Sequence, residues 1–145
     1  MKESEAYNIL VNSGIRPSVQ RLAIMDYLLN HRTHPTVDEI FTALGKKITT
    51  LSRTTVYNTL RLFADHHAAQ MLTIDERRVC YDGDMRPHVH FLCERCGMVI
   101  DLFDEPVPVL SQSREVNGNL VIDTQLYYRG ICAECQRKEK NILNN

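Results

Sequence analysis

Four of the five cysteines fall into two pairs of identical spacing. Cys93-x-x-Cys96 and Cys132-x-x-Cys135 are separated by 35 residues. In a cytosol that keeps thiols reduced, this pattern favours metal ligation over disulfide formation. A closed site of four thiolates suits structural zinc, because it leaves no ligand position for chemistry. We therefore predict a structural Zn(2+) held by Cys93, Cys96, Cys132 and Cys135.

Two other interpretations of these cysteines are a redox-active pair and ordinary buried thiols. A thioredoxin-like redox pair would need a βαβ setting, which the surrounding sequence does not have. The fifth cysteine, Cys80, stands alone in a predicted strand. We expect it to be a small packed side chain.

A second group of residues offers three imidazoles and two carboxylates. His88 and His90 lie two residues apart, so on a strand both side chains point to the same side. Any one member alone is more often solvated or hydrogen-bonded, but their clustering at the predicted domain junction favours a shared metal. Such donors suit Fe(II), Mn(II) or Zn(II). The predicted exchangeable site consists of His34, Asp82, His88, His90 and Asp101.

The elements that position these residues must fit into 145 residues, enough for one ordinary domain or two small ones. The net charge is −1, but residues 1–80 carry 10 Lys/Arg against 8 Asp/Glu and residues 81–145 carry 7 against 10. This weak basic excess permits DNA contact by the first part without proving it. No apolar run is long enough for a membrane span, and the N-terminus is acidic where a signal peptide needs bases. We expect a cytoplasmic protein with no membrane partner.

The first part of the chain has the periodicity of helices followed by a hairpin. Helices are expected at residues 4–13, 18–30, from 36 onward and at 52–66, the third beginning at the capping box Thr36-Val37-Asp38-Glu39. Residues 71–74 and 79–81 are expected to form two strands around a charged turn. Helices followed by a two-stranded wing predict a winged helix-turn-helix, whose last helix enters the DNA major groove.

The helix expected at 52–66 divides into two faces. Val56, Leu60 and Phe63 fall on one side and should be buried. The opposite side offers hydrogen-bond donors that could contact DNA, although a solvated polar face on an ordinary bundle helix would have the same pattern. This polar face comprises Arg53, Thr54, Tyr57, Asn58 and Arg61.

The second part predicts a small α+β domain. Strands are expected at residues 89–92, 98–100 and 119–128, with helix candidates near 107–115 and after Cys135. A domain of this size cannot build a large core, so the zinc would contribute much of its stability. We predict an α+β fold with domains at residues 1–82 and 83–145.

Several motifs together resemble the ferric uptake regulator (Fur) family. Residues 14–21 (GIRPSVQR), 34–40 (HPTVDEI) and 52–60 (SRTTVYNTL) resemble its DNA-binding domain. Residues 88–97 (HVHFLCERCG) and the closing Cys132-x-x-Cys135 resemble its dimerization domain. The match runs from about residue 5 to 139.

The resemblance implies a homodimeric, metal-dependent transcriptional repressor of double-stranded operator DNA rather than an enzyme. Arg16, in the first motif, joins the expected DNA contacts. Iron-responsive members tend to carry glutamate at the positions of Asp82 and Asp101, whereas peroxide-sensing (PerR) members carry aspartate. Asn58 also resembles the peroxide branch. The implied cofactors are structural Zn(2+) and regulatory Fe(2+) or Mn(2+), with peroxide as the signal.

In such sensors, peroxide and Fe(II) oxidise a site histidine to 2-oxo-histidine, here His34 or His88. The nearest alternative is a Fur-type iron-responsive or Mur-type manganese-responsive repressor. A zinc enzyme that uses His88, His90 and a carboxylate is a further alternative, but the sequence contains no H-E-x-x-H helix.

Overall fold

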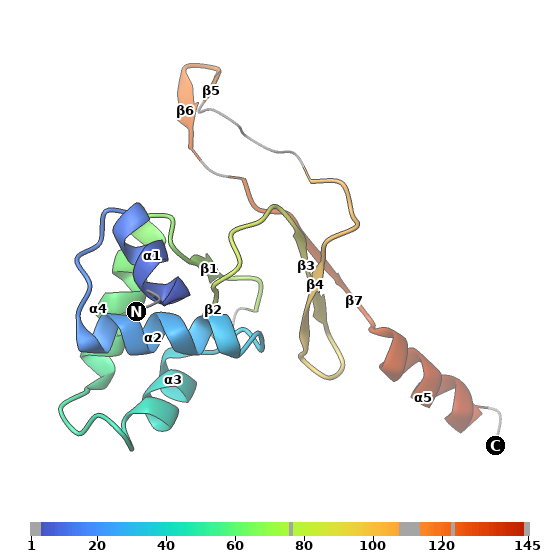
Figure 1. Ribbon diagram of the computed structural model, residues 1–145. Coiled ribbons are helices and arrows are strands. Elements are labelled where there is room, and N and C mark those ends of the chain that lie inside the picture. Colours follow the sequence, from blue (N-terminus) through green and yellow to red (C-terminus); the bar gives the residue numbers. More distant parts are fainter. Residues whose placement is uncertain (1–3, 76, 108–113, 123, 144–145) are drawn as a thin grey trace. The chain divides into compact units, whose positions relative to one another are not determined.

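The computed structural model describes residues 4–75, 77–107, 114–122 and 124–143 (Figure 1). The chain divides into two compact units, Met1–Met85 and Arg86–Asn145. The boundary expected after residue 82 therefore falls within the last residues of unit 1. Among the described residues, no helix is long and apolar enough to cross a membrane.

Unit 1 begins with four helices that start where their capping residues predict. They are α1 (Glu5–Asn12), α2 (Val19–Asn30), α3 (Val37–Leu44) and α4 (Arg53–Asp65). In each helix the preceding Ser or Thr accepts a hydrogen bond from the backbone N–H three residues on, which satisfies one of the free donors of the first turn. These N-caps are Ser4, Ser18, Thr36 and Ser52.

The core of unit 1 lies between these helices. The expected face of α4 is confirmed, since Val56, Leu60 and Phe63 are fully buried. The periodicity of residues 18–30 predicts one face of Leu22, Met25 and Leu29, but of these only Met25 is buried, and Leu22 and Leu29 are only partly buried against the core. Ile24 and Leu28 are buried in their place. Contacts of α2 with α1, α3 and α4 explain why its buried arc is wider than a single stripe.

The wing is a short antiparallel hairpin of β1 (Gln70–Leu72) and β2 (Cys80–Asp82), in which Leu72 faces Cys80. β1 is shorter than the strand expected at residues 71–74, although Ile74 beyond it is still buried, and β2 begins one residue later than the strand expected at 79–81. The backbone N–H of Tyr81 donates to the carbonyl of Pro35 at 3.0 Å. This bond fixes β2 beside the segment that precedes α3.

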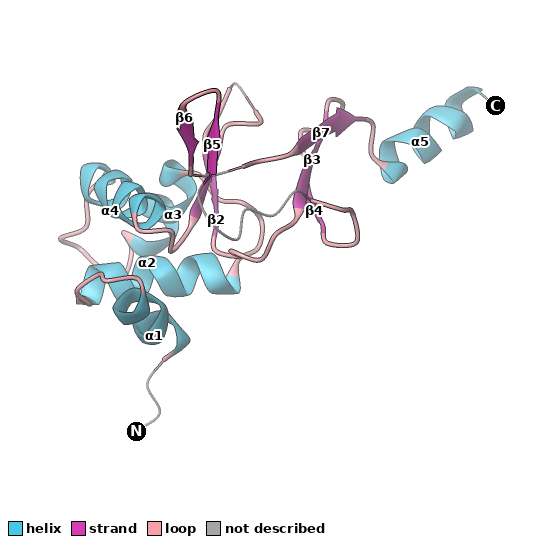
Figure 2. Ribbon diagram, turned by 90° about the horizontal axis from the view of Figure 1, so that it is seen from above, coloured by secondary structure: helices cyan, strands magenta, loops and turns pink. Residues whose placement is uncertain are grey.

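Unit 2 is built on a three-stranded sheet of order β4-β3-β7 (Figure 2). The strands β3 (Val89–Cys93) and β4 (Val99–Leu102) are antiparallel, with His90 opposite Asp101. β7 (Tyr127–Gly130) runs parallel to β3, with Gly130 opposite Cys93. This register brings the end of β7 to the first cysteine pair.

The prediction of one long strand at residues 119–128 is wrong. The chain instead forms β6 (Asn119–Val121), paired with β5 (Arg114–Val116), and later β7. Asn117 and Gly118 join β5 to β6, with φ of +52° and +81°. Two residues with positive φ make the tight turn that suits a hairpin, and Asn-Gly is its usual sequence.

Two helix predictions also need correction. Most of the candidate at 107–115 lies outside the described residues, but its last positions belong to the strand β5. The helix expected after Cys135 is α5 (Ala133–Leu143), which begins two residues before that cysteine. Cys135 therefore lies in the first turn of α5.

Candidate metal centres and nucleic-acid interface

The four cysteines of the predicted zinc site converge in unit 2. All four sulfur atoms lie within 4.8 Å of one another. The sulfurs of Cys93 and Cys135 are 3.8 Å apart, and those of Cys96 and Cys132 are 3.9 Å apart. These distances exceed the ~2.05 Å of a disulfide. They agree with a tetrahedron of sulfurs ~2.3 Å from a zinc ion, whose edges are about 3.8 Å.

The two Cys-x-x-Cys turns repeat one geometry. In each pair, the backbone N–H of the second cysteine donates to the sulfur of the first at 3.5 Å. Gly97 closes the first turn with φ of +76°, a conformation that favours glycine, as expected for a knuckle. The sequence spacing alone thus sets up both halves of the site.

Hydrogen bonds and crowding act in opposite directions on the thiols. Backbone N–H groups of Cys96 and Cys132 stabilise the thiolate of Cys93 and lower its pKa from 9.0 to about 6. The neighbouring sulfurs, Cys132 above all, raise the pKa of Cys135 to about 12. Beside the thiolate of Cys93, the thiol of Cys135 keeps its proton at neutral pH unless a cation compensates the charge. The donor set therefore fits a divalent, thiolate-binding ion such as zinc.

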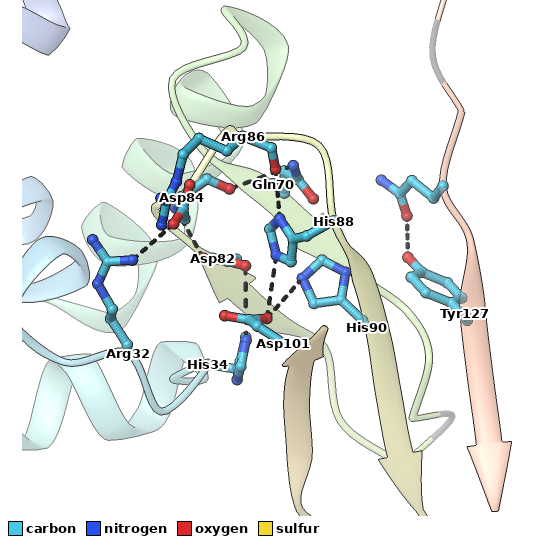
Figure 3. A network of polar contacts seen from close by, with 11 residues as sticks. Arg32, His34, Gln70, Asp82, Asp84, Arg86, His88, His90, Asp101 and Tyr127 are labelled. Carbon is cyan, nitrogen blue, oxygen red and sulfur yellow. Dashed lines mark hydrogen bonds and ion pairs between the residues drawn. The ribbon is translucent and has the colours of Figure 1, made fainter. Parts of the chain in front are cut away.

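The donors of the second predicted site divide between the two units, with His34 and Asp82 in unit 1 and His88, His90 and Asp101 in unit 2. In unit 2, the Nε2 atoms of His88 and His90 lie 3.2 Å and 3.4 Å from Oδ1 of Asp101 (Figure 3). Ligands about 2.1 Å from one ion are separated by about 3 Å when they subtend a right angle. These three side chains therefore have the spacing of a partial coordination shell.

Contacts with Arg86 and Phe103 fix the orientation of the His88 ring. Its Nδ1 lies 2.5 Å from the carbonyl oxygen of Arg86, which can only accept, so Nδ1–H is the donor and Nε2 is the nitrogen on the side of Asp101. Phe103 stacks on the same ring at 4.5 Å between centroids. These contacts present His88 to a metal in one tautomer and one orientation.

In unit 1, His34 and Asp82 lie close together, with His34 Nε2 3.7 Å from Asp82 Oδ2. His34 follows α2 and Asp82 ends β2, so the bond between Tyr81 and Pro35 brings the two together. His34 has φ of +56°, a conformation uncommon outside glycine. Residues in such conformations concentrate at functional sites, where the surrounding structure holds them in place.

A contact near Asp82 was not foreseen from the sequence. The backbone N–H of Asp84 donates to Oδ1 of Asp82 at 2.8 Å. The side chain of Asp84 is buried, and its Oδ2 lies 2.7 Å from Nη1 of Arg32 (Figure 3). An Asp-x-Asp spacing permits such an Asx turn, but nothing in the sequence indicated that Arg32, 52 residues away, would pair with it.

The predicted DNA-contact face of α4 lies on the surface of unit 1. Every residue of the predicted polar face is exposed, opposite the buried side of the helix. Arg16, also exposed, lines a polar groove of about 630 Å³ with Asn58. The exposed residues of α4 are Arg53, Thr54, Tyr57, Asn58 and Arg61.

Arg53 differs from the other members of this face because it has protein partners. Its Nε lies 2.7 Å from Oδ1 of Asp38, and its guanidinium lies 4.8 Å from the centre of the Phe41 ring. Both partners belong to α3. No local pattern of residues predicts this pair.

The chain matches a known protein family over most of its length. Residues 12–129 match the family model described as "Ferric uptake regulator family". The peroxide operon regulator of Bacillus subtilis is 36% identical over 138 residues, which cover 94% of this chain and 95% of that protein.

Two solved structures extend the comparison. PerR from Streptococcus pyogenes is 27% identical, with a TM-score of 0.51 over 93% of this chain and 96% of that chain. The ferric uptake regulator of Helicobacter pylori is 21% identical, with a TM-score of 0.65 over 94% of this chain and 97% of that chain. At that identity the second likeness shows the fold alone.

Proposed function

The chain belongs to the ferric uptake regulator family, and from that premise we propose that it is a metal-dependent transcriptional repressor that senses peroxide. The observation that carries the proposal is that both carboxylates of the donor set are aspartates, each beside a histidine. Asp82 lies beside His34, and Asp101 lies beside His88. The resemblance associates aspartate at these positions with peroxide sensing. The names of the Bacillus subtilis and Streptococcus pyogenes relatives agree with this assignment.

The proposed regulatory metal is Fe(II) or Mn(II), bound by His34, Asp82, His88, His90 and Asp101. Imidazole and carboxylate donors suit these ions better than they suit softer ones. Two of the ligands belong to unit 1 and three to unit 2. One ion that needs all five would favour a single arrangement of the units, and this shift in population would couple metal binding to DNA binding.

Fe(II) held by these five donors would supply the redox chemistry that activates hydrogen peroxide. One peroxide oxygen would be transferred to the imidazole of His34 or His88, a two-electron oxidation of the ring that gives 2-oxo-histidine, and the other oxygen would leave as water. The oxidised ring binds metal poorly, the arrangement of the units is released, and repression ends.

The four cysteines have a separate role in this proposal. They bind a structural Zn(2+), which ties the β3–β4 turn to the start of α5 and leaves no position open for chemistry. Unit 2 would dimerise, and two copies of α4 would reach successive major grooves of a double-stranded operator. The protein would act in the cytoplasm, with peroxide as its only small-molecule signal.

The test is metal-dependent and peroxide-dependent DNA binding by the full chain. A bound duplex is first selected from a random library with the Mn(II)-loaded protein, and its affinity is then measured by fluorescence anisotropy with Fe(II). We expect tight binding that needs Fe(II) or Mn(II) and is lost after peroxide only with Fe(II). Tight binding that survives peroxide would favour an iron- or manganese-responsive repressor instead.

A further inference from the structure

The first turn of α3 carries two acidic side chains that each pair with an arginine from another element. Asp38 Oδ1 lies 2.7 Å from Nε of Arg53, the first residue of α4. Glu39 Oε1 lies 3.2 Å from Nη1 of Arg78, in the turn of the wing. Two neighbouring acids in one helical turn thus pair with arginines of α4 and of the wing, the elements that contact DNA in a winged helix.

The position of the acids has a local explanation, but the position of the arginines does not. Carboxylates are favoured in the first turn of a helix because they lie at the positive end of its dipole. That preference is satisfied without a cation nearby. Arg53 and Arg78 come from separate elements, and Arg53 is placed further by its contact with Phe41. The stability of α3 therefore does not explain why these two arginines lie beside the acids.

Folding does not depend on these pairs. Between 40% and 73% of each of the four side chains is exposed to solvent. Ion pairs at such exposure contribute little to the free energy of unfolding and open easily. A phosphate group could therefore replace either carboxylate as the partner of its arginine.

We propose that Asp38 and Glu39 are intramolecular counter-ions of Arg53 and Arg78, which DNA phosphates displace on binding. The inference rests on the proposed function, and it assigns Arg78 a contact with the DNA backbone. An arginine that meets a phosphate releases a condensed cation from DNA. The carboxylate left behind attracts counter-ions from solution, which offsets part of that release. The acids would thereby restrain DNA binding that depends on charge alone.

The test is the salt dependence of binding to a short mixed-sequence duplex, measured with the Mn(II)- and zinc-loaded full chain. In Asp38→Asn the phosphate contact of Arg53 is no longer offset. We expect the slope of log K against log salt to become more negative by up to about 0.9 for each Arg53 that meets a phosphate. Affinity at low salt should rise by up to about fivefold.

Glu39→Gln should act in the same direction but less strongly. Asp75 Oδ2 also lies 3.7 Å from Arg78, so this variant frees Arg78 only in part. Asp65→Asn is the matched control, because it removes one acidic charge from the last residue of α4, about 18 Å along the helix from Arg53. Its slope should equal that of the parent protein.

Two further measurements keep the outcome clear. Circular dichroism must show that the variants are folded. In an Arg53→Ala background, Asp38→Asn should no longer change the slope. An unchanged slope in both acidic variants, or an equal change in Asp65→Asn, would overturn the inference while the parent still binds DNA. Failure of the metal-loaded parent to bind any duplex would instead overturn the proposed function.

Discussion

The backbone N–H of Asp84 holds the carboxylate of Asp82 by a hydrogen bond of 2.8 Å to Oδ1. The other oxygen of Asp82, Oδ2, lies on the side of His34, at 3.7 Å from its Nε2. Asp84 is itself paired with Arg32 through its side chain. A proposed metal ligand is thus positioned by its neighbour two residues on, and that neighbour is anchored by the segment after α2.

The anchor can be tested with Arg32→Ala. The buried carboxylate of Asp84 loses a cationic partner, and because the Arg32 side chain is 55% exposed we expect a loss of only about 1 kcal/mol in the free energy of unfolding. Mn(II) affinity should fall as well. Urea unfolding and Mn(II) titration measure the two effects. Adding Asp84→Asn should restore part of the stability, and a double variant less stable than Arg32→Ala would contradict this account.

Removal of one zinc ligand should remove the zinc. In Cys93→Ser or Cys132→Ser, three thiolates leave the ion under-coordinated, so we expect loss of tightly bound zinc and of the folded dimer. Native mass spectrometry of the intact protein reports both. Cys80→Ser is the control and should keep its zinc. A folded, zinc-bearing dimer in the ligand variants would rule out the structural role.

Cys80 should be unreactive in the folded protein. Burial raises the pKa of its thiol from 9.0 to about 11, so almost no thiolate is present at pH 8. Iodoacetamide should modify it only after unfolding, and the adduct should be absent from Cys80→Ala. Because the folded pKa lies above the unfolded one, this group favours folding fully below pH 9, and its contribution is lost as pH rises toward 11. Rapid alkylation of the native protein would show that the thiol is accessible.

The exposed face of α4 predicts two kinds of DNA effect. Tyr57→Ala or Asn58→Ala should weaken binding to the selected operator by about 1–3 kcal/mol with less effect on mixed-sequence DNA, as a base-reading contact requires. Arg61→Ala should weaken both and flatten the salt dependence. Anisotropy titrations at several salt concentrations separate these patterns. If all three variants bound DNA as tightly as the parent protein, α4 would be a packing element only.

The length of Asp101 should matter for peroxide sensing. Its Oδ1 lies between the Nε2 atoms of His88 and His90. Asp101→Glu adds a methylene and pushes the carboxylate toward the position that peroxide needs. We expect this variant to bind the operator with Mn(II) or Fe(II) but, after peroxide, to dissociate from it more slowly than the parent protein does. A parental rate of release would show that the carboxylate does not control access.

The features that the sequence predicted are those set by neighbouring residues. The capping box that begins at Thr36 marks the start of α3, and each Cys-x-x-Cys pair forms one half of the four-sulfur cluster. The same local logic could have found the turn at Asn117-Gly118, which joins β5 to β6 directly before the long strand expected at residues 119–128.

The features that could not be predicted from the sequence depend on contacts between distant segments. Arg32 reaches Asp84 across 52 residues, and Arg53 pairs with Asp38 across 15. Side-chain pairs of this kind follow from the packing of α2, α3 and α4 rather than from spacing along the chain. Predicting Arg53 as a free DNA contact therefore overlooked a partner that no local pattern reveals.

Peptide mapping by mass spectrometry of the Fe(II)-loaded protein, before and after a small excess of peroxide, tests the central claim most directly. The account predicts an added oxygen on His34 or His88, together with loss of operator binding. Protein with zinc in the regulatory site is the control and should gain none, because zinc has no redox chemistry. Fe(II)-loaded protein that stays on the operator with both histidines unmodified would contradict the peroxide-sensing function.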